Sequence, residues 1–182
     1  MFVVDDEEEV ADVYALRLRS EYDTRTAYGG RAALDEIDES VDVVLLDRRM
    51  PDIAGDEVLE RIREHGLDCR VIMITAVDPD FDIVEMPFDD YLCKPVDKDD
   101  IVAAIEQRLT ATRYDDRMDE YLEVTSKIAL LEAEKTAHEL DENEEIEALR
   151  ERAEQLKAEM DETLDEFTDI EAAFQEIGRH PN

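Results

Sequence analysis

Apolar and polar residues alternate along the first hundred positions in short blocks of two kinds. Five short runs without a helical period predict strands. The run at residues 43–46 is fully apolar and ends abruptly in Asp47, which is typical of a strand buried on both faces. The five runs are residues 2–4, 24–27, 43–46, 71–74 and 91–93. Between and after them, apolar residues recur three and four positions apart, which predicts helices. The helical positions are Val10, Val13 and Tyr14; Ala33, Leu34 and Ile37; Val58, Leu59 and Ile62; and, from about Asp97, Ile101, Val102, Ile105 and Leu109.

The regular alternation of strands and helices predicts an α/β fold. We expect a doubly wound, five-stranded parallel sheet with right-handed crossovers and helices on both faces. With the first strand between the second and third, the strand order is 2-1-3-4-5, as in flavodoxin-like folds. Between the fourth and fifth strands, Pro79 and Pro87 bracket too few residues for a full helix. We therefore expect a turn or an irregular loop in that connection.

The chain beyond Leu109 has almost no Gly or Pro until Gly178. Its apolar residues alternate three and four positions apart, which predicts a coiled-coil seam. The seam positions are Ile146, Leu149, Ala153, Leu156, Met160, Thr163, Phe167, Ile170, Phe174 and Ile177, preceded by a looser series of Met118, Tyr121, Thr125 and Ile128 with Leu122 and Leu131 alongside. Asp141-Glu142-Asn143 offers a cap and a turn between the halves. The pattern favours an all-α antiparallel helical hairpin, whereas a parallel dimer of the second half or a hairpin paired across a homodimer are the alternatives.

The charge balance is extreme, with 53 acidic against 20 basic residues and a net charge of −33. Such a surface repels nucleic acid phosphates and anionic membranes. Because 43% of the residues are hydrophobic and recur at clear periods, the composition does not indicate a disordered chain. It is typical of a protein that works in concentrated salt, where the Debye length falls to about 3 Å.

No apolar run approaches the roughly 18 residues of a membrane span, and no basic start precedes an apolar stretch, as in a signal peptide. Cys69 and Cys93 each lie in an apolar segment, which favours two core thiols in a reducing compartment. We therefore expect a cytoplasmic protein of a high-salt cell, with no membrane partner.

Polar side chains stand where the predicted strands end: Asp5 and Asp6 after the first, Asp47 after the third, Thr75 at the end of the fourth and Lys94 after the fifth. Because the carboxyl ends of parallel strands meet at one edge of the sheet, these side chains should converge. Three carboxylates close together repel one another unless a cation joins them. We therefore expect this edge to bind a hard divalent ion that prefers oxygen ligands, with Mg²⁺ as the first candidate. Each residue alone would be an ordinary cap or loop residue, but five at one edge are a specific signal.

Residues 1–110 resemble a response-regulator receiver domain. The matching residues are Asp5-Asp6, the segment Asp47-x-x-Met50-Pro51-x-x-x-Gly55, Thr75-Ala76, and Tyr91 three residues before Lys94-Pro95. The resemblance implies that Asp47 accepts a phosphoryl group from a partner histidine kinase. It also implies that Asp6 and Asp47 bind Mg²⁺ directly together with the backbone carbonyl of Arg49, and that Asp5 acts through water. The remaining implied roles are phosphoryl binding by the Thr75 hydroxyl and Ala76 amide, charge pairing by Lys94, a switch formed by Thr75 and Tyr91, and a cis bond between Lys94 and Pro95.

Residues 111–182 resemble the HalX domain that follows receivers in haloarchaeal proteins, mainly through the Ser126-Lys127-x-Ala-Leu-Leu-Glu-Ala-Glu-Lys135 region. Together the two resemblances imply a two-component response regulator, not an enzyme, that transmits a phosphorylation switch through a helical interaction domain. For the arm itself, a solvated spacer or dimeriser is an equal alternative.

The main functional alternative is a DNA-binding transcriptional regulator that uses the C-terminal helices. Against it, the basic residues there form no dense face; they are Arg150, Arg152, Lys157 and Arg179. A phosphatase of the haloacid dehalogenase type would need a second Asp two residues after its nucleophile, where this chain has Arg49. Two further points stay open: Arg48 and Arg49 are either a solvated pair or include a residue leaning over the site, and Tyr91 is either a switch or a half-buried edge aromatic.

Overall fold

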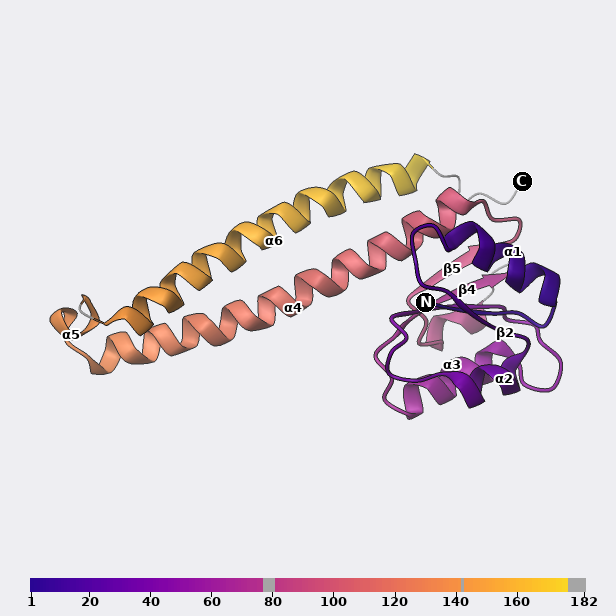
Figure 1. Ribbon diagram of the computed structural model, residues 1–182, viewed down its shortest axis with the longest axis horizontal. Helices are drawn as coiled ribbons and strands as arrows, with labels where there is room; N and C mark the ends of the chain where they lie inside the picture. The colour runs from indigo at the N-terminus through magenta and orange to yellow at the C-terminus, as the bar shows by residue number, and fades with distance from the viewer. Residues whose placement is uncertain (77–80, 142, 177–182) are drawn as a thin grey trace. The chain divides into compact units, whose positions relative to one another are not determined.

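The computed structural model describes residues 1–76, 81–141 and 143–176 (Figure 1). It forms two compact units, Met1–Arg108 and Leu109–Ala173, and the division between them falls inside one helix. The domain boundary expected at residue 110 stays a prediction. The described part of the chain does not include Pro79. It also does not include Ile177 or the side chains of Phe167, Ile170 and Phe174, so the seam positions predicted there stay predictions.

The first unit contains a parallel sheet of five strands in the order β2-β1-β3-β4-β5, which confirms the predicted topology. The strands are β1 (Phe2–Val4), β2 (Arg25–Ala27), β3 (Val43–Leu46), β4 (Arg70–Thr75) and β5 (Asp90–Cys93). Leu46 at the end of β3 lies opposite Val4 on one side and Met73 on the other. At the next pair, Thr75 lies opposite Cys93. This register brings the carboxyl ends of four strands to one edge of the sheet.

Helices cover both faces of this sheet (Figure 1). They are α1 (Glu8–Leu18), α2 (Gly30–Glu36), α3 (Gly55–Glu64) and the first part of α4 (Lys98–Glu134). Because side chains alternate along a strand, Val44, Leu46 and Met73 join the core beneath α2 and α3, and Leu45 and Ile72 face the other way. All five are at most 2% exposed. Burial on both faces explains why the sequence of these strands is almost continuously apolar.

The connection between β4 and β5 contains only a short 3₁₀ helix, η1 (Phe81–Glu85), in its described part. From residue 81 to β5, no α-helix forms, in agreement with the predicted turn or loop. The two cysteines differ in burial: Cys69 is buried as predicted, but Cys93 on the edge strand β5 is exposed. The prediction for Cys93 was wrong because an apolar strand sequence does not show whether a helix covers that end of the strand.

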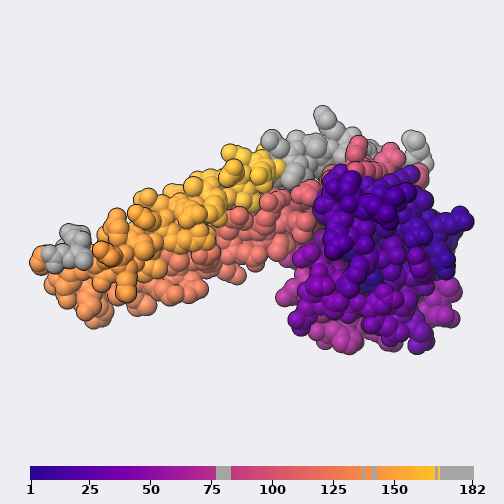
Figure 2. Space-filling view, viewed as in Figure 1, coloured from indigo at the N-terminus to yellow at the C-terminus, as the bar shows by residue number. Residues whose placement is uncertain are grey.

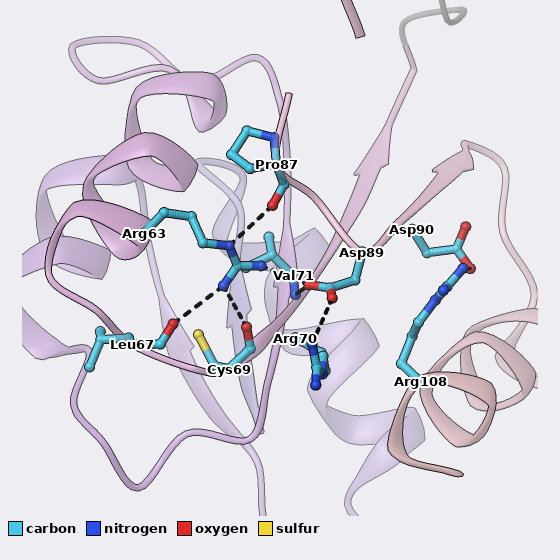
Figure 3. Close-up of polar contacts among 9 residues, drawn as sticks. All are labelled: Arg63, Leu67, Cys69, Arg70, Val71, Pro87, Asp89, Asp90 and Arg108. Atoms are coloured by element: carbon cyan, nitrogen blue, oxygen red, sulfur yellow. Dashed lines mark hydrogen bonds and ion pairs between the residues drawn. The ribbon is translucent and has the colours of Figure 1, made fainter. Parts of the chain in front are cut away.

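Arg63, at the end of α3, holds the start of β4 and β5 together at the opposite edge of the sheet (Figure 3). Its guanidinium donates to the Pro87 carbonyl at 3.1 Å and to the Cys69 carbonyl at 2.7 Å. The Arg63 guanidinium also donates to Oδ2 of Asp89 at 2.7 Å. This Asp89 oxygen accepts a second hydrogen bond, from the Val71 N–H, at 2.7 Å. Arg70 pairs with the other oxygen of Asp89 at 3.2 Å, so Arg63 and Arg70 together fix the segment that enters β5.

The second unit is an antiparallel helical hairpin, as predicted: α6 (Glu144–Glu176) returns along α4 (Figures 1 and 2). The buried seam residues on α6 are Ile146, Leu156, Met160 and Thr163, each at a predicted position. In the hairpin part of α4, Thr110 and Val124 are buried, Leu122 is 54% exposed, and the predicted positions are partly buried. These positions are Met118, Tyr121, Thr125 and Ile128. The looser apolar pattern of α4 thus predicted the side of the helix that faces the seam, but it did not single out Val124.

The two long helices are joined by a short helix, α5 (Ala137–Asp141). Asn143 caps α6, as predicted, because its Oδ1 accepts the N–H groups of Glu145 at 2.8 Å and Ile146 at 3.1 Å. α5 was not predicted, although a capping box marks its start: Thr136 N–H donates to Glu139, and Glu139 N–H donates to the Thr136 hydroxyl.

Within the described ranges, no helix has the length and apolar character of a membrane span. The high-salt cytoplasmic setting stays a prediction.

Candidate functional site

The carboxyl ends of β1, β3, β4 and β5 surround a hollow of about 390 Å³. The residues that line it are Asp5, Asp6, Glu7, Asp47, Arg49, Thr75, Ala76 and Lys94. The structure thus places around one hollow every residue that the sequence nominated for this edge, with the exception of Tyr91.

Lys94 joins two of the acidic residues in this hollow. Its Nζ lies 2.7 Å from Oδ1 of Asp47 and 2.8 Å from Oδ2 of Asp5. The side chains are 8% exposed for Asp47, 4% for Asp5 and 20% for Lys94. The second oxygen of Asp47 accepts the Arg49 N–H at 2.7 Å, and Oδ1 of Asp5 accepts the Glu7 N–H at 3.0 Å. Both carboxylates are therefore held in fixed orientations by main-chain groups on one side and by an ammonium on the other.

Burial sets the protonation behaviour of this pair. Loss of water raises the pKa of the Asp47 carboxyl, while the hydrogen bond and charge of Lys94 act in the opposite direction. Burial by itself would lower the pKa of Lys94, but its hydrogen bonds to Asp47 and Asp5 outweigh that effect, so the pKa of Lys94 is raised. Lys94 therefore stays a cation and provides a fixed positive charge beside Asp47.

The loop after β3 packs directly against the backbone of Asp47, and Gly55 makes this close approach possible. A Cβ at Gly55 would lie 2.2 Å from the Asp47 carbonyl oxygen, well inside contact distance. The Gly55 N–H instead donates to the Arg48 carbonyl at 2.9 Å. Within the loop, Asp52 adopts a φ of 67°, a left-handed conformation that Asp tolerates better than most residues. Gly55 thus lets the start of α3 pack directly behind Asp47.

Thr75 and Tyr91 occupy different places relative to the hollow. Thr75 ends β4 and is 1% exposed, whereas Ala76 beside it is exposed. Tyr91 is half-buried against the core beneath α3, with its ring centroid 5.6 Å from that of Phe88. It does not line the hollow, so its role as a switch stays a prediction. The Lys94–Pro95 bond is cis, as expected.

Sequence reasoning missed one lining residue and left two others undecided. Glu7 was not nominated for the site, but it is the N-cap position of α1 and lines the hollow. Its place directly after Asp6 was the signal that could have found it. Of the two arginines, Arg49 lines the hollow and is exposed, whereas Arg48 turns away to pair with Asp56.

The oxygen donors at this edge fit a magnesium ion. In the part of the chain that the structure describes, no three carboxylate, imidazole or thiolate groups converge as a metal-binding cluster. Mg²⁺ does not require such a cluster, because it is commonly held by one or two carboxylates and keeps several water molecules. Asp5, Asp6 and Asp47 supply hard oxygen donors of this kind at a single hollow.

Comparison with known proteins identifies both units. Residues 1–106 match the family model of the response regulator receiver domain, and residues 110–176 match that of the HalX domain. A protein of Haloferax volcanii described as a "Putative transcriptional regulator" is 49% identical over 160 residues, which cover 87% of this chain and 27% of that protein. The chain thus spans little more than a quarter of that relative's length.

Two solved structures show the same fold as the first unit. The response regulator protein TrrA from Thermotoga maritima, determined in complex with Mg²⁺ and BeF, is 29% identical with a TM-score of 0.51, covering 58% of this chain and 94% of that chain. A CheY-like receiver domain protein from Methanospirillum hungatei has a TM-score of 0.55 at 24% identity, covering 59% of this chain and 90% of that chain. With the family match over residues 1–106, these findings show that the chain belongs to the response regulator receiver domain family and carries a HalX domain after its receiver domain.

Proposed function

We propose that Asp47 accepts a phosphoryl group from a histidine kinase and that the resulting charge switches the protein. The observation that carries this proposal is the position of Lys94, whose ammonium lies 2.7 Å from Asp47 and 2.8 Å from Asp5 at the carboxyl edge of the sheet. A fixed cation beside a buried carboxylate is suited to balance the charge that develops when that carboxylate becomes an acyl phosphate.

In the proposed step, a carboxylate oxygen of Asp47 attacks phosphorus in line. The new oxygen–phosphorus bond forms as the phosphorus–nitrogen bond of the kinase's phosphohistidine breaks, and the bonding electrons return to the imidazole nitrogen. Catalysis of such a transfer is mainly positioning and charge neutralisation. Lys94 supplies positive charge, and the Thr75 hydroxyl and Ala76 amide bind phosphoryl oxygens. The protein turns over no separate substrate, so the only chemistry is its own phosphorylation and dephosphorylation.

Mg²⁺ is the proposed cofactor of this step. Asp6 and Asp47 would hold it directly with the backbone carbonyl of Arg49, and Asp5 would act through a water molecule. When bound, the ion supplies positive charge to the phosphoryl oxygens. Support comes from the oxygen donors at the hollow and from the Mg²⁺–BeF complex of the Thermotoga relative.

The proposed response is a change in packing around Thr75 and Tyr91. Phosphorylation adds roughly one to two negative charges at the edge of the sheet. If the Thr75 hydroxyl moves toward the phosphoryl group, it vacates space into which Tyr91 can turn. The half-buried position of Tyr91 beside Phe88 would be one of the two arrangements of such a switch, and the ring turned inward would be the other.

The proposed output is protein interaction through the HalX domain. α4 belongs to both cores, because Ile101 and Ile105 are buried in the receiver unit and Val124 in the hairpin seam. Hairpin packing leaves Leu122 54%, Leu130 69% and Leu164 47% exposed. Exposed leucines of this kind are suited to contact a partner protein or a second copy of the chain.

A DNA-binding transcriptional regulator is the second candidate, favoured by the description of the Haloferax relative. The charges of the hairpin oppose it, because its arginines pair with glutamates of the opposite helix. These pairs are Arg113–Glu166, Arg117–Glu159, Arg150–Glu132 and Arg152–Glu120. Cations engaged in this way are not available to neutralise phosphates. A gel-shift assay in molar salt that finds sequence-specific binding would favour this second candidate.

The proposed phosphoacceptor is tested by labelling the full chain with acetyl phosphate and Mg²⁺ and weighing the intact protein. We expect the unsubstituted chain to gain one phosphoryl group and Asp47→Asn to gain none. Asp52→Asn is the matched control, because it makes the same change in the same loop at a left-handed position that Asn tolerates. Normal labelling of Asp47→Asn would refute the assignment.

A further inference from the structure

Arg48, directly after the proposed phosphoacceptor, is held by the first turn of α3. Its Nε lies 3.0 Å from Oδ1 and 3.3 Å from Oδ2 of Asp56, and its Nη2 lies 3.1 Å from Oδ2. The Arg48 side chain is only 10% exposed, and that of Asp56 is 43% exposed. A two-pronged arginine–carboxylate pair fixes orientation as well as charge. The negative charge of Asp56 is also favourable at the N-terminus of a helix.

The main chain of Arg48 is tied to the same helix start. Its carbonyl accepts the Gly55 N–H at 2.9 Å, and a Cβ at Gly55 would lie 2.9 Å from the Arg48 Cα. On the other side, the Arg49 N–H donates to Oδ2 of Asp47 at 2.7 Å. The backbone from Asp47 to Arg49 is therefore fixed by α3 through one main-chain bond and one side-chain pair.

We infer that the Arg48–Asp56 pair positions the backbone of the Mg²⁺ site and thereby sets the affinity for the ion. This inference rests on the proposed function, in which Asp47 and the Arg49 carbonyl are ligands. Arg48 acts through its neighbours in the chain and touches neither the ion nor the phosphoryl group. Removal of groups that orient metal ligands in this way commonly lowers the affinity for the metal by about 10- to 100-fold.

The sign of the effect separates positioning from simple charge. Arg48 is a cation, so its field alone disfavours Mg²⁺, and its replacement by a neutral residue would tighten Mg²⁺ binding if only the field mattered. If Arg48 positions the ligands, the same replacement weakens binding. Arg48→Lys sharpens the distinction, because lysine keeps the charge but cannot form the two-pronged pair.

The experiment is calorimetric titration of the full chain with MgCl₂ in molar KCl. We expect Arg48→Met, Arg48→Lys and Asp56→Ala each to weaken Mg²⁺ binding, with Arg48→Met about ten-fold weaker. The double variant Arg48→Met/Asp56→Ala should bind like Arg48→Met alone, because both changes remove one interaction. Arg61→Met is the matched control, since Arg61 makes an exposed pair with Glu57 on the same helix, and its affinity should not change.

Mg²⁺ binding by Arg48→Met that equals or exceeds that of the unsubstituted chain overturns the inference. If thermal unfolding shows that Arg48→Met is not folded, Arg48→Lys decides, and unchanged affinity in that variant overturns the inference as well. Labelling at Asp47 separates the two proposals: an unsubstituted chain that neither binds Mg²⁺ nor is labelled refutes the proposed function and this inference together. A chain that is labelled and binds Mg²⁺ equally well in every variant refutes only the inference.

Discussion

In the receiver domain, Arg63 gives its N–H groups to main-chain carbonyls and to the carboxylate of Asp89, whereas in the HalX domain Arg152 pairs with Glu120 across two exposed helices. The side chains of Arg63 and Asp89 are 28% and 16% exposed, against 35% and 45% for Arg152 and Glu120. Bonds to uncharged carbonyls are nearly independent of salt, but exposed ion pairs are screened by it. The same residue type therefore has a structural role in one unit and a weak, salt-dependent one in the other.

The apolar core of the receiver domain is also more extensively buried than that of the HalX hairpin. The receiver sheet is covered on both faces, and its central strands are buried along their whole length. The described seam of the hairpin is a single row, in which Leu149 and Ala153 remain partly exposed between Ile146 and Leu156. Because a two-layer core removes more apolar surface from water than one seam does, the hairpin should be the weaker unit.

Removal of salt should separate the two units most strongly. Lowering the salt from about 1 M to about 0.01 M lengthens the Debye length from about 3 Å to about 30 Å. Exposed ion pairs then strengthen, but with a net charge of −33 the repulsion among carboxylates dominates. We expect hydrogen exchange to show that amides of α6 lose protection before those of β3 and β4. Loss of protection in the strands first would break the comparison.

Truncation of one buried side chain in each unit gives the next largest effect. Ile72→Ala in the centre of the sheet should lower the free energy of unfolding by about 2–5 kcal/mol, because neighbours on both faces cannot close the cavity. Ile72 and Leu156 are both 0% exposed, but Leu156→Ala should cost only about 2 kcal/mol, since a single seam can relax around the gap. Urea denaturation in molar salt measures both. An equal or larger cost for Leu156→Ala would contradict the proposed difference.

Arg63→Met tests the structural arginine of the receiver domain. The change leaves the carbonyls of Cys69 and Pro87 without a charged donor and Asp89 with its ion pair to Arg70, and should lower the free energy of unfolding by about 1.5–3 kcal/mol. The loss should be the same in moderate and in molar salt. Arg61→Met is the control, because Arg61 makes an exposed pair with Glu57 in the same domain and should change stability very little. A loss for Arg63→Met that vanishes in molar salt would place Arg63 with the hairpin arginines.

Much of the receiver domain could be predicted because the strand order and direction alone determine where its site residues lie. Asp47 and Lys94 each follow a buried strand, and parallel strands bring their ends to one edge, so residues 47 positions apart meet without knowledge of side-chain contacts. The pairing of Arg48 with Asp56 could not be predicted in this way. It depends on where a long, flexible side chain points, and the sequence is equally consistent with a solvated arginine.

The hairpin shows the limits of periodicity. In the described part of α6, the strict seam predicted the buried residues Ile146, Leu156, Met160 and Thr163 correctly, but on α4 the looser pattern did not single out Val124. The sequence also contained a signal that went unused: Thr136 and Glu139 stand three residues apart, as a capping box requires, and mark the start of α5. The continuity of α4 through the boundary between the units follows from the absence of Gly and Pro, which leaves no local reason for a break.

Arg152→Met should have the smallest effect and defines the other end of the comparison. The change removes the two-pronged pair with Glu120, a longer pair with Glu159 at 3.6 Å, and one positive charge from an acidic hairpin. Lys157→Met removes the same charge from the same helix, so the difference between the two variants isolates the contribution of the two pairs. A double-mutant cycle with Glu120→Gln should show a coupling that is measurable in low salt and disappears in molar salt, because screening acts on exposed pairs. A coupling that persists in molar salt would mean that the hairpin arginines also act structurally, and the contrast with Arg63 would then rest on burial alone.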